Sequence, residues 1–140
     1  MRIDMTIYVI DDHPLMRDAI VTLLRRLRPD MRIVELGLLA EVQFIKESAS
    51  SPSVFFLDLH LPDAPGFSGV HGIKASFPSV PLAVYSASPA SEMGRMCIEA
   101  GADLYVEKTA SSKHIAAALR MLLPKLTRDQ VQHTSSPTTV

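Results

Sequence analysis

Five side chains able to bind a metal ion or a phosphoryl group stand directly after, or close after, short apolar runs of the sequence. They are Asp11, Asp12, Asp58, Ser86 and Lys108. If the runs are parallel strands of one sheet, these side chains converge, because such sheets bind ligands beyond the carboxyl ends of their strands. Three neighbouring carboxylates repel one another, and a hard divalent cation such as Mg²⁺, which prefers oxygen ligands, would relieve that repulsion. The sequence therefore predicts a magnesium site.

The same residues suit phosphoryl transfer. A carboxylate can attack phosphorus as a nucleophile and form an acyl phosphate. Such transfer depends chiefly on positioning and on neutralising the equatorial oxygens, and here the metal, the Lys108 ammonium and the Ser86 hydroxyl would each hold one. Taken singly, each residue would more simply be a helix cap, a turn residue or a solvated charge. The prediction depends on their combination.

The elements that must position these residues alternate along the chain. Short runs rich in β-branched and aromatic residues cover 7–10, 33–36, 54–57, 82–85 and 104–106. Apolar residues at helical spacing follow them over 15–27, 42–45, 70–77, 93–100 and 115–123. Most of the runs are apolar on both faces, as parallel strands covered by helices require. The pattern predicts an α/β fold with a doubly wound five-stranded parallel sheet and right-handed crossovers.

Local signals mark the ends of several helices. Pro14 and Pro29 suit the start and the end of the first helix, whose apolar stripe begins with Leu15. Gly101 is placed for a left-handed C-terminal cap. Beyond Pro124 the apolar periodicity fades. We therefore expect one domain over 1–124 and a linker or disordered tail over 125–140.

Composition excludes several classes of protein. The net charge of −1 gives no basic field that would recruit nucleic acid. The single cysteine, Cys97, can form no disulfide within the chain and reads as a packed small hydrophobe. The sequence has no signal-peptide pattern and no apolar run of about 20 residues that would span a membrane. A cytoplasmic protein with no membrane partner is expected.

Four segments carry a resemblance to a known family: 7–20, which contains Asp11-Asp12-His13-Pro14, 55–62 with Gly66 after it, 85–88, and 100–108. Together they resemble the receiver domains of two-component response regulators, most of all those of the NarL/FixJ (LuxR-type) subfamily. The resemblance extends in register over residues 5–123 and implies the flavodoxin-like (βα)5 receiver fold.

The resemblance implies that Asp58 is the phosphoacceptor, phosphorylated by a sensor histidine kinase with Mg²⁺ as cofactor. It implies that Asp12, Asp58 and the backbone carbonyl of His60 bind the metal directly, with Asp11 acting largely through water. The protein would then be no enzyme beyond its own phosphorylation and dephosphorylation.

The resemblance also implies a switch. Ser86 and Lys108 would contact the phosphoryl group, and Ala87 leaves room for it. Tyr105 matches an aromatic position that turns inward when the Ser86 hydroxyl moves toward the phosphate. Without the family, Tyr105 would be read as an ordinary strand aromatic in the core. Thr109 departs from the proline that many receivers carry after the lysine.

The output is not evident from these residues. In the resembled subfamily it is a C-terminal helix-turn-helix that binds DNA, and the residues after the fifth helix are too few to form one. Either an output domain that controls transcription is missing from this chain, or the protein is a stand-alone receiver that acts through protein contacts. Homodimerisation on phosphorylation is a further expectation from the family.

Three other interpretations compete with this one. A Mg²⁺-dependent phosphohydrolase with an Asp nucleophile usually has a second Asp two residues later, where His60 stands. A nucleotide-binding protein would need a glycine-rich loop after the first strand. An interaction module that has lost phosphorylation would not need all five site residues. We expect His13, His71, His114 and His133 to be solvated or locally hydrogen-bonded rather than ligands.

Overall fold

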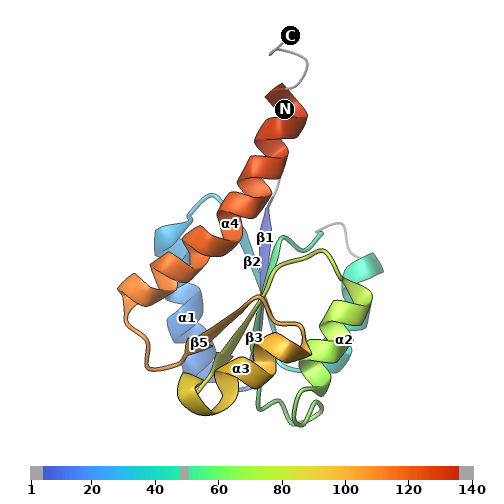
Figure 1. The fold of residues 1–140 in the computed structure, drawn as a ribbon, viewed down its shortest axis with the longest axis vertical. Coiled ribbons are helices and arrows are strands. Elements are labelled where there is room, and N and C mark those ends of the chain that lie inside the picture. Colours follow the sequence, from blue (N-terminus) through green and yellow to red (C-terminus); the bar gives the residue numbers. More distant parts are fainter. Residues whose placement is uncertain (1–4, 48–50, 136–140) are drawn as a thin grey trace.

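Strands and helices alternate along the chain (Figure 1). The computed structural model describes the backbone of residues 5–47 and 51–135, with side chains for 5–45 and 51–123. The strands are β1 (Thr6–Ile10), β2 (Arg32–Leu36), β3 (Val54–Asp58), β4 (Leu82–Ser86) and β5 (Leu104–Glu107). The helices are α1 (Pro14–Leu27), the 3₁₀ helix η1 (Leu39–Glu47), α2 (Ser68–Ser76), α3 (Ala90–Ala100) and α4 (Ser112–Ser135).

The five strands form one parallel sheet in the order β2-β1-β3-β4-β5. Ile10 of β1 pairs with Leu57 of β3, so the residues that follow these two strands are neighbours at one edge of the sheet. Ser86 of β4 pairs with Glu107 of β5, which brings the residue after β5 to the same edge. The predicted α/β fold with a doubly wound parallel sheet is confirmed.

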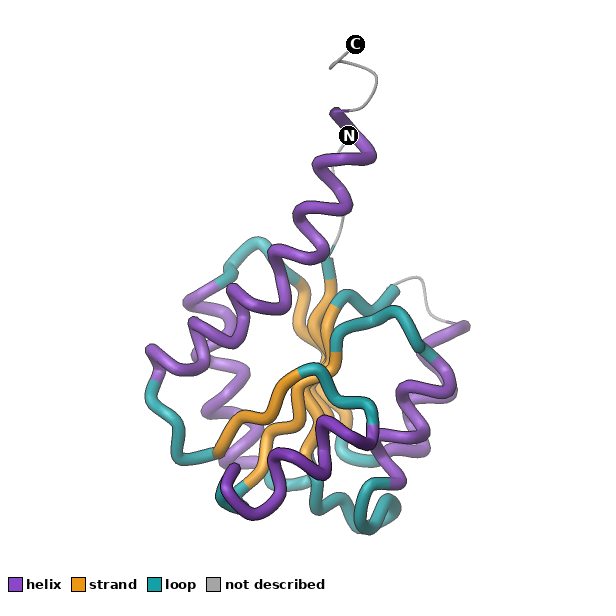
Figure 2. Tube along the Cα trace, in the orientation of Figure 1, coloured by secondary structure: helices purple, strands orange, loops and turns teal. Residues whose placement is uncertain are grey.

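Helices cover both faces of the sheet (Figures 1 and 2). Helices α1 and α4 pack on one face around Val9 and Phe56. On the other face η1, α2 and α3 pack around Phe55 and Leu57, and the fully buried Cys97 contributes to that core as expected. Successive strand residues point to opposite faces. The inner strands β1, β3 and β4 are buried along their whole length because helices cover both of their faces, whereas the outer strand β2 exposes Arg32 and Glu35.

The core side of α1 differs from the expected stripe. Ile20, Val21 and Leu24 are its buried residues, whereas Leu15 is 84% exposed. An α-helix turns about 100° per residue, which places Leu15 nearly opposite the centre of this buried group. The expectation that Leu15 faces the core was wrong.

The second helix is a 3₁₀ helix rather than an α-helix. Residues three apart lie above one another in this geometry, and Val42 and Ile45 are accordingly both buried. Phe44, which lies between them in the sequence, is 59% exposed. The Asp63 carboxylate accepts hydrogen bonds of 3.0 Å from the backbone N–H groups of Leu39 and Ala40, at the start of η1.

The end of α3 is where the sequence predicts it, whereas α4 is longer than predicted. Gly101 follows α3 with φ of 124°, which confirms the predicted C-terminal cap. Helix α4 continues through Pro124 to Ser135, past the point where we expected helical structure to fade. Five of the eleven residues over 125–135 are lysine, leucine, arginine or glutamine, which favour helix. The last part of the predicted tail, residues 136–140, and the His133 side chain lie outside the described residues. Across the residues described, no helix is both long and apolar enough to cross a membrane.

Candidate functional site

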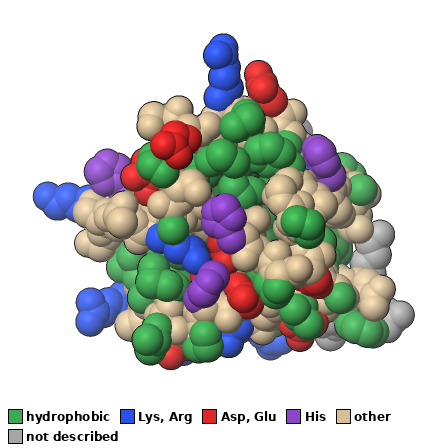
Figure 3. Space-filling view, turned by 90° about the horizontal axis from the view of Figure 1, so that it is seen from below, with side chains coloured by type: hydrophobic (Ala, Val, Ile, Leu, Met, Phe, Trp, Pro, Cys, Tyr) green, Lys and Arg blue, Asp and Glu red, His purple; other side chains and the backbone are tan. Residues whose placement is uncertain are grey.

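The five side chains singled out in the sequence meet at the edge of the sheet where the strands end. Asp11 and Asp12 follow β1, Asp58 and Ser86 are the last residues of β3 and β4, and Lys108 follows β5. The Lys108 backbone N–H donates to the Ser86 carbonyl at 2.7 Å, which fixes the chain at this edge. Figure 3, viewed from this edge, shows acidic, basic and histidine side chains gathered near the centre of the surface.

The Lys108 ammonium lies among the carboxylates. Its Nζ is 3.0 Å from Asp11 Oδ2 and 3.5 Å from Asp58 Oδ1. The Lys108 side chain is 6% exposed and both of these carboxylates are 1% exposed, while that of Asp12 is 32% exposed. The ring of Tyr85 lies beneath the ammonium, with its centroid 5.6 Å from Nζ. One ammonium leaves three carboxylates only partly neutralised.

The two buried carboxyl groups titrate differently. Burial raises the pKa of Asp58, and the N–H of His60 and the Lys108 ammonium oppose that rise without cancelling it. Burial also works to raise the pKa of Asp11, but hydrogen bonds from His13 and Lys108 outweigh it and the pKa is lowered. Of these two carboxyl groups, Asp58 is the one whose negative charge is less well compensated.

The donor set fits a hard divalent cation. Asp12 Oδ1 and Asp58 Oδ2 are buried and accept no hydrogen bond from the described residues. Buried carboxylate oxygens normally have a partner, so these two lack one that a cation would supply. One ligand atom each from Asp11, Asp12, His13 and Asp58 falls within 4.8 Å of the others. Such an oxygen-rich cluster is suited to Mg²⁺.

Sequence reasoning did not place His13 in this cluster. Its Nδ1 lies 2.9 Å from Asp11 Oδ1, 3.2 Å from Asp12 Oδ1 and 3.3 Å from Asp58 Oδ2. The bond to Asp11 is local and was within the expectation, but the approach to Asp58 was not. The bond with Asp11 raises the pKa of His13. The available signal was its position directly after two carboxylates and before Pro14, which restricts the backbone there.

The loop after β4 is held from two sides. The hydroxyl of Tyr105 donates a 2.6 Å hydrogen bond to the Ser88 carbonyl. On the other side, His60 Nε2 lies 3.1 Å from Ser88 Oγ. The buried hydroxyl of Ser86 accepts a 3.1 Å bond from the Ser88 N–H. Ser88 therefore connects His60, in the loop after β3, to the aromatic ring of Tyr105 on β5.

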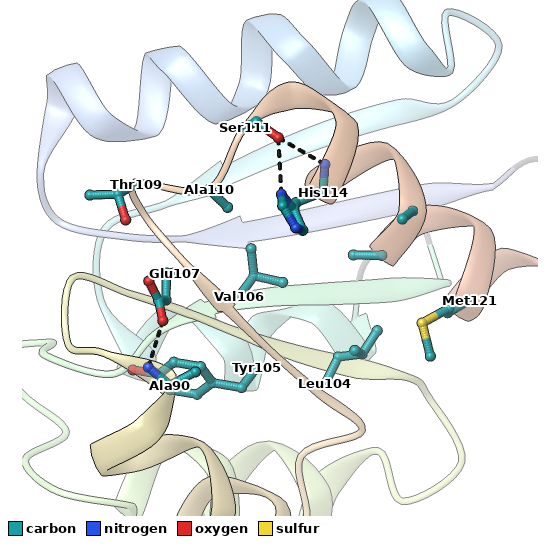
Figure 4. Close-up of a pocket in the computed structure, with 12 residues that line it drawn as sticks. Ala90, Leu104, Tyr105, Val106, Glu107, Thr109, Ala110, Ser111, His114 and Met121 are labelled. Atoms are coloured by element: carbon teal, nitrogen blue, oxygen red, sulfur yellow. Dashed lines mark hydrogen bonds between the residues drawn. The ribbon is translucent and has the colours of Figure 1, made fainter.

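A groove of about 580 Å³ lies beside β5, between α3 and α4. In Figure 4, Ala90 and Tyr105 lie on its α3 side and Ser111 and His114 on its α4 side. His114 Nδ1 is 3.0 Å from Ser111 Oγ, the local hydrogen bond expected for this histidine. The exposed Met121 lines the groove as well. Tyr105 lines the groove, whereas Asp11, Asp12 and Asp58 do not.

Comparisons with known proteins agree with this geometry. The family described as the response regulator receiver domain matches residues 7–120. The transcriptional regulatory protein CreB of Escherichia coli (strain K12) is 29% identical over 122 residues, which cover 86% of this chain and 52% of CreB. The response regulator protein VraR of Staphylococcus aureus (strain COL) is 29% identical, over 83% of this chain and 56% of VraR. The chain thus spans about half the length of these relatives.

Solved structures share the fold. A LuxR-family two-component response regulator from Aurantimonas sp. SI85-9A1 is 25% identical, with a TM-score of 0.76 over 88% of this chain and 87% of that one. A CheY-like receiver domain protein from Methanospirillum hungatei JF-1 has a TM-score of 0.77 at 16% identity, over 91% of this chain and 99% of that one.

Proposed function

Because this chain belongs to the response regulator receiver domain family, we propose that it accepts a phosphoryl group on Asp58 and changes conformation to control an output. Domains of this family act as regulators rather than as enzymes. The observation that carries the proposal is the placement of Asp58, buried at the sheet edge with Lys108 Nζ 3.5 Å away and one oxygen without a hydrogen bond. Asp11 and Asp12 stand beside it.

In the proposed reaction a carboxylate oxygen of Asp58 forms a bond to phosphorus. The phosphorus–nitrogen bond of a phosphohistidine on a sensor histidine kinase breaks, and its electron pair leaves with the imidazole, which takes up a proton. Lys108 turns its ammonium toward one phosphoryl oxygen and Ser86 donates its hydroxyl to another. Both groups already lie at this edge of the sheet, beside Asp58.

Asp12, Asp58 and the His60 carbonyl would hold Mg²⁺ directly. When bound, Mg²⁺ neutralises carboxylate charge and polarises a phosphoryl oxygen. The pairing of Asp11 with Lys108 at 3.0 Å supports an indirect role for Asp11, acting largely through water.

The proposed switch runs from Ser86 through the loop to Tyr105. The Ser86 hydroxyl accepts a hydrogen bond from the Ser88 N–H. Movement of this hydroxyl toward a phosphoryl oxygen would break that hydrogen bond. The Ser88 carbonyl is the acceptor of the Tyr105 hydroxyl, so the loop and the ring would shift together. This shift would change the shape of the groove beside Tyr105. We propose that an output domain or a second copy of the chain binds at this surface.

We propose control of transcription through a DNA-binding output domain as the output. CreB is a transcriptional regulatory protein, and the Aurantimonas relative is of the LuxR family. Membership of the NarL/FixJ subfamily stays a proposal, because similar structures also include DrrB, an OmpR/PhoB homologue, and the NtrX receiver domain. A stand-alone receiver acting through protein contacts is the alternative. A cytoplasmic location and homodimerisation on phosphorylation are part of the same proposal.

Intact-mass measurement tests the phosphoacceptor. The protein is incubated with Mg²⁺ and acetyl phosphate, then with or without hydroxylamine, which cleaves acyl phosphates. We expect one phosphoryl adduct that hydroxylamine removes, that is absent in Asp58→Asn and that persists in Asp18→Asn, an exposed carboxylate on α1. An adduct that survives Asp58→Asn, or none in the unaltered protein, contradicts the proposal.

A further inference from the structure

The imidazole of His13 lies where a metal ligand would lie. Its Nδ1 is 2.9, 3.2 and 3.3 Å from one oxygen each of Asp11, Asp12 and Asp58. Adjacent ligands of an octahedral ion with bonds of about 2.1 Å are about 3.0 Å apart. The nitrogen and the three oxygens are therefore spaced like neighbouring ligands around one ion.

Two further observations indicate a prepared position rather than a chance contact. The buried Asp58 Oδ2, one of the three oxygens near Nδ1, accepts no hydrogen bond from the described residues. The His13 backbone N–H also donates to Asp11 Oδ1 at 2.9 Å, and the backbone is extended there ahead of Pro14 at the start of α1. The backbone of His13 is thus fixed against the cluster, and only two side-chain torsions remain to orient the ring.

We propose that His13 is a third side-chain ligand of the divalent cation, beside Asp12 and Asp58, and that it determines which cation the site prefers. This inference rests on the metal role of the proposed phosphoacceptor site. Imidazole nitrogen is a poor ligand for Mg²⁺ and a better one for later transition ions such as cobalt, nickel and zinc. With His13 the site binds these ions more tightly, relative to Mg²⁺, than its carboxylates alone would. Nε2 would then carry the ring proton, on a side chain that is 54% exposed.

A protonated imidazole paired with carboxylates is the competing explanation for the same distances. It differs in what happens when a cation binds, because an imidazolium has no lone pair on either nitrogen and would have to leave the cluster.

Pulsed electron paramagnetic resonance of the Mn²⁺ complex separates the two. We expect modulation from a directly bound imidazole nitrogen in the unaltered protein and in His114→Ala, which removes an exposed histidine distant from the carboxylates. The modulation should be absent in His13→Ala. An Mn²⁺ complex of the unaltered protein without nitrogen modulation overturns the proposal, as does modulation that persists in His13→Ala.

Calorimetric titration supplies the thermodynamic arm. We expect His13→Ala to lower the ratio of Co²⁺ to Mg²⁺ affinity by about tenfold, with little change in His114→Ala. An unchanged ratio counts against the proposal. Phosphoryl transfer is scored separately with acetyl phosphate and Mg²⁺. If Mn²⁺ is bound by nitrogen but Asp58 forms no adduct, the proposed function is refuted and this inference stands. If Asp58 forms an adduct but the Mn²⁺ complex shows no nitrogen modulation, this inference is refuted and the proposed function stands.

Discussion

Lys108 is paired more closely with Asp11 than with Asp58, at 3.0 Å against 3.5 Å. The closer partner is the carboxylate of lowered pKa, whereas the nucleophile proposed for the reaction has a raised pKa. The Lys108 ammonium is therefore paired mainly with Asp11. It would have to turn away from Asp11 to reach a phosphoryl oxygen on Asp58.

Removing this ammonium should destabilise the protein. Lys108→Ala leaves Asp11 and Asp58 buried without their cation, which we expect to cost about 3–5 kcal/mol in the free energy of unfolding. Urea denaturation in the presence of a chelator measures it, and Lys113→Ala, an exposed lysine on α4, serves as the control. Added Mg²⁺ should restore part of the loss, because a cation then replaces the ammonium. Equal unfolding midpoints for the two variants would show that the pair is not needed.

Removing the charge of Asp58 should have the opposite effect. Its raised pKa means that the folded state disfavours the ionised form, so its contribution to stability is present at low pH and is lost as pH rises through that pKa. Without metal, Asp58→Asn should therefore be more stable than the unaltered protein near neutral pH. Urea denaturation at several pH values should show this advantage shrinking toward acid. An advantage that grows toward acid would reverse the assigned sign.

Asp63 should stabilise the start of η1. Burial works to raise its pKa, but the N–H groups of Leu39 and Ala40 outweigh this and lower it. Stability from Asp63 is thus present above its ordinary pKa and lost as pH falls through the lowered value. Asp63→Ala should cost about 0.5–2 kcal/mol, as for other helix caps. Hydrogen exchange at the two amides should accelerate, unlike in Asp18→Ala, and unchanged exchange would exclude the capping role.

Two glycines at α3 should respond oppositely to alanine. A Cβ on Gly94 would lie 3.6 Å from Ala90 Cβ and 3.8 Å from Tyr105 Cγ, which is ordinary contact. Gly94→Ala should then stabilise the protein by about 1 kcal/mol through helix propensity. Gly101 has φ of 124°, and its Cβ would meet Lys74 Cγ at 3.3 Å. Gly101→Ala should cost about 1–3 kcal/mol. Thermal denaturation of both variants checks the pair, and shifts of the same sign would contradict the assignment.

The sheet and most of the cluster could be predicted because their signals are local. Five apolar runs fix the strands, and the residue type after each run fixes what stands at the edge. The orientation of His13 could not be predicted, because it depends on a turn whose N–H donates to Asp11. The exposure of Leu15 was missed because residues four apart in an α-helix differ in direction by about 40°. A series of such spacings therefore moves gradually off the buried face, and Leu15 lies at its exposed end. The hydrogen bond between Tyr105 and Ser88 joins segments that only the folded chain brings together.

Lys108 follows an outer strand, whereas Asp11 and Asp12 follow the inner strand β1 and Asp58 ends the inner strand β3. β5 pairs only with β4 among the described strands, so it can open locally at a smaller free-energy cost than the strands between which the carboxylates lie. An opened form would keep its carboxylates and lose their ammonium, and it would therefore bind divalent cations more tightly than the closed form. By thermodynamic linkage, the docked β5 strand and a bound cation compete for the same negative charge.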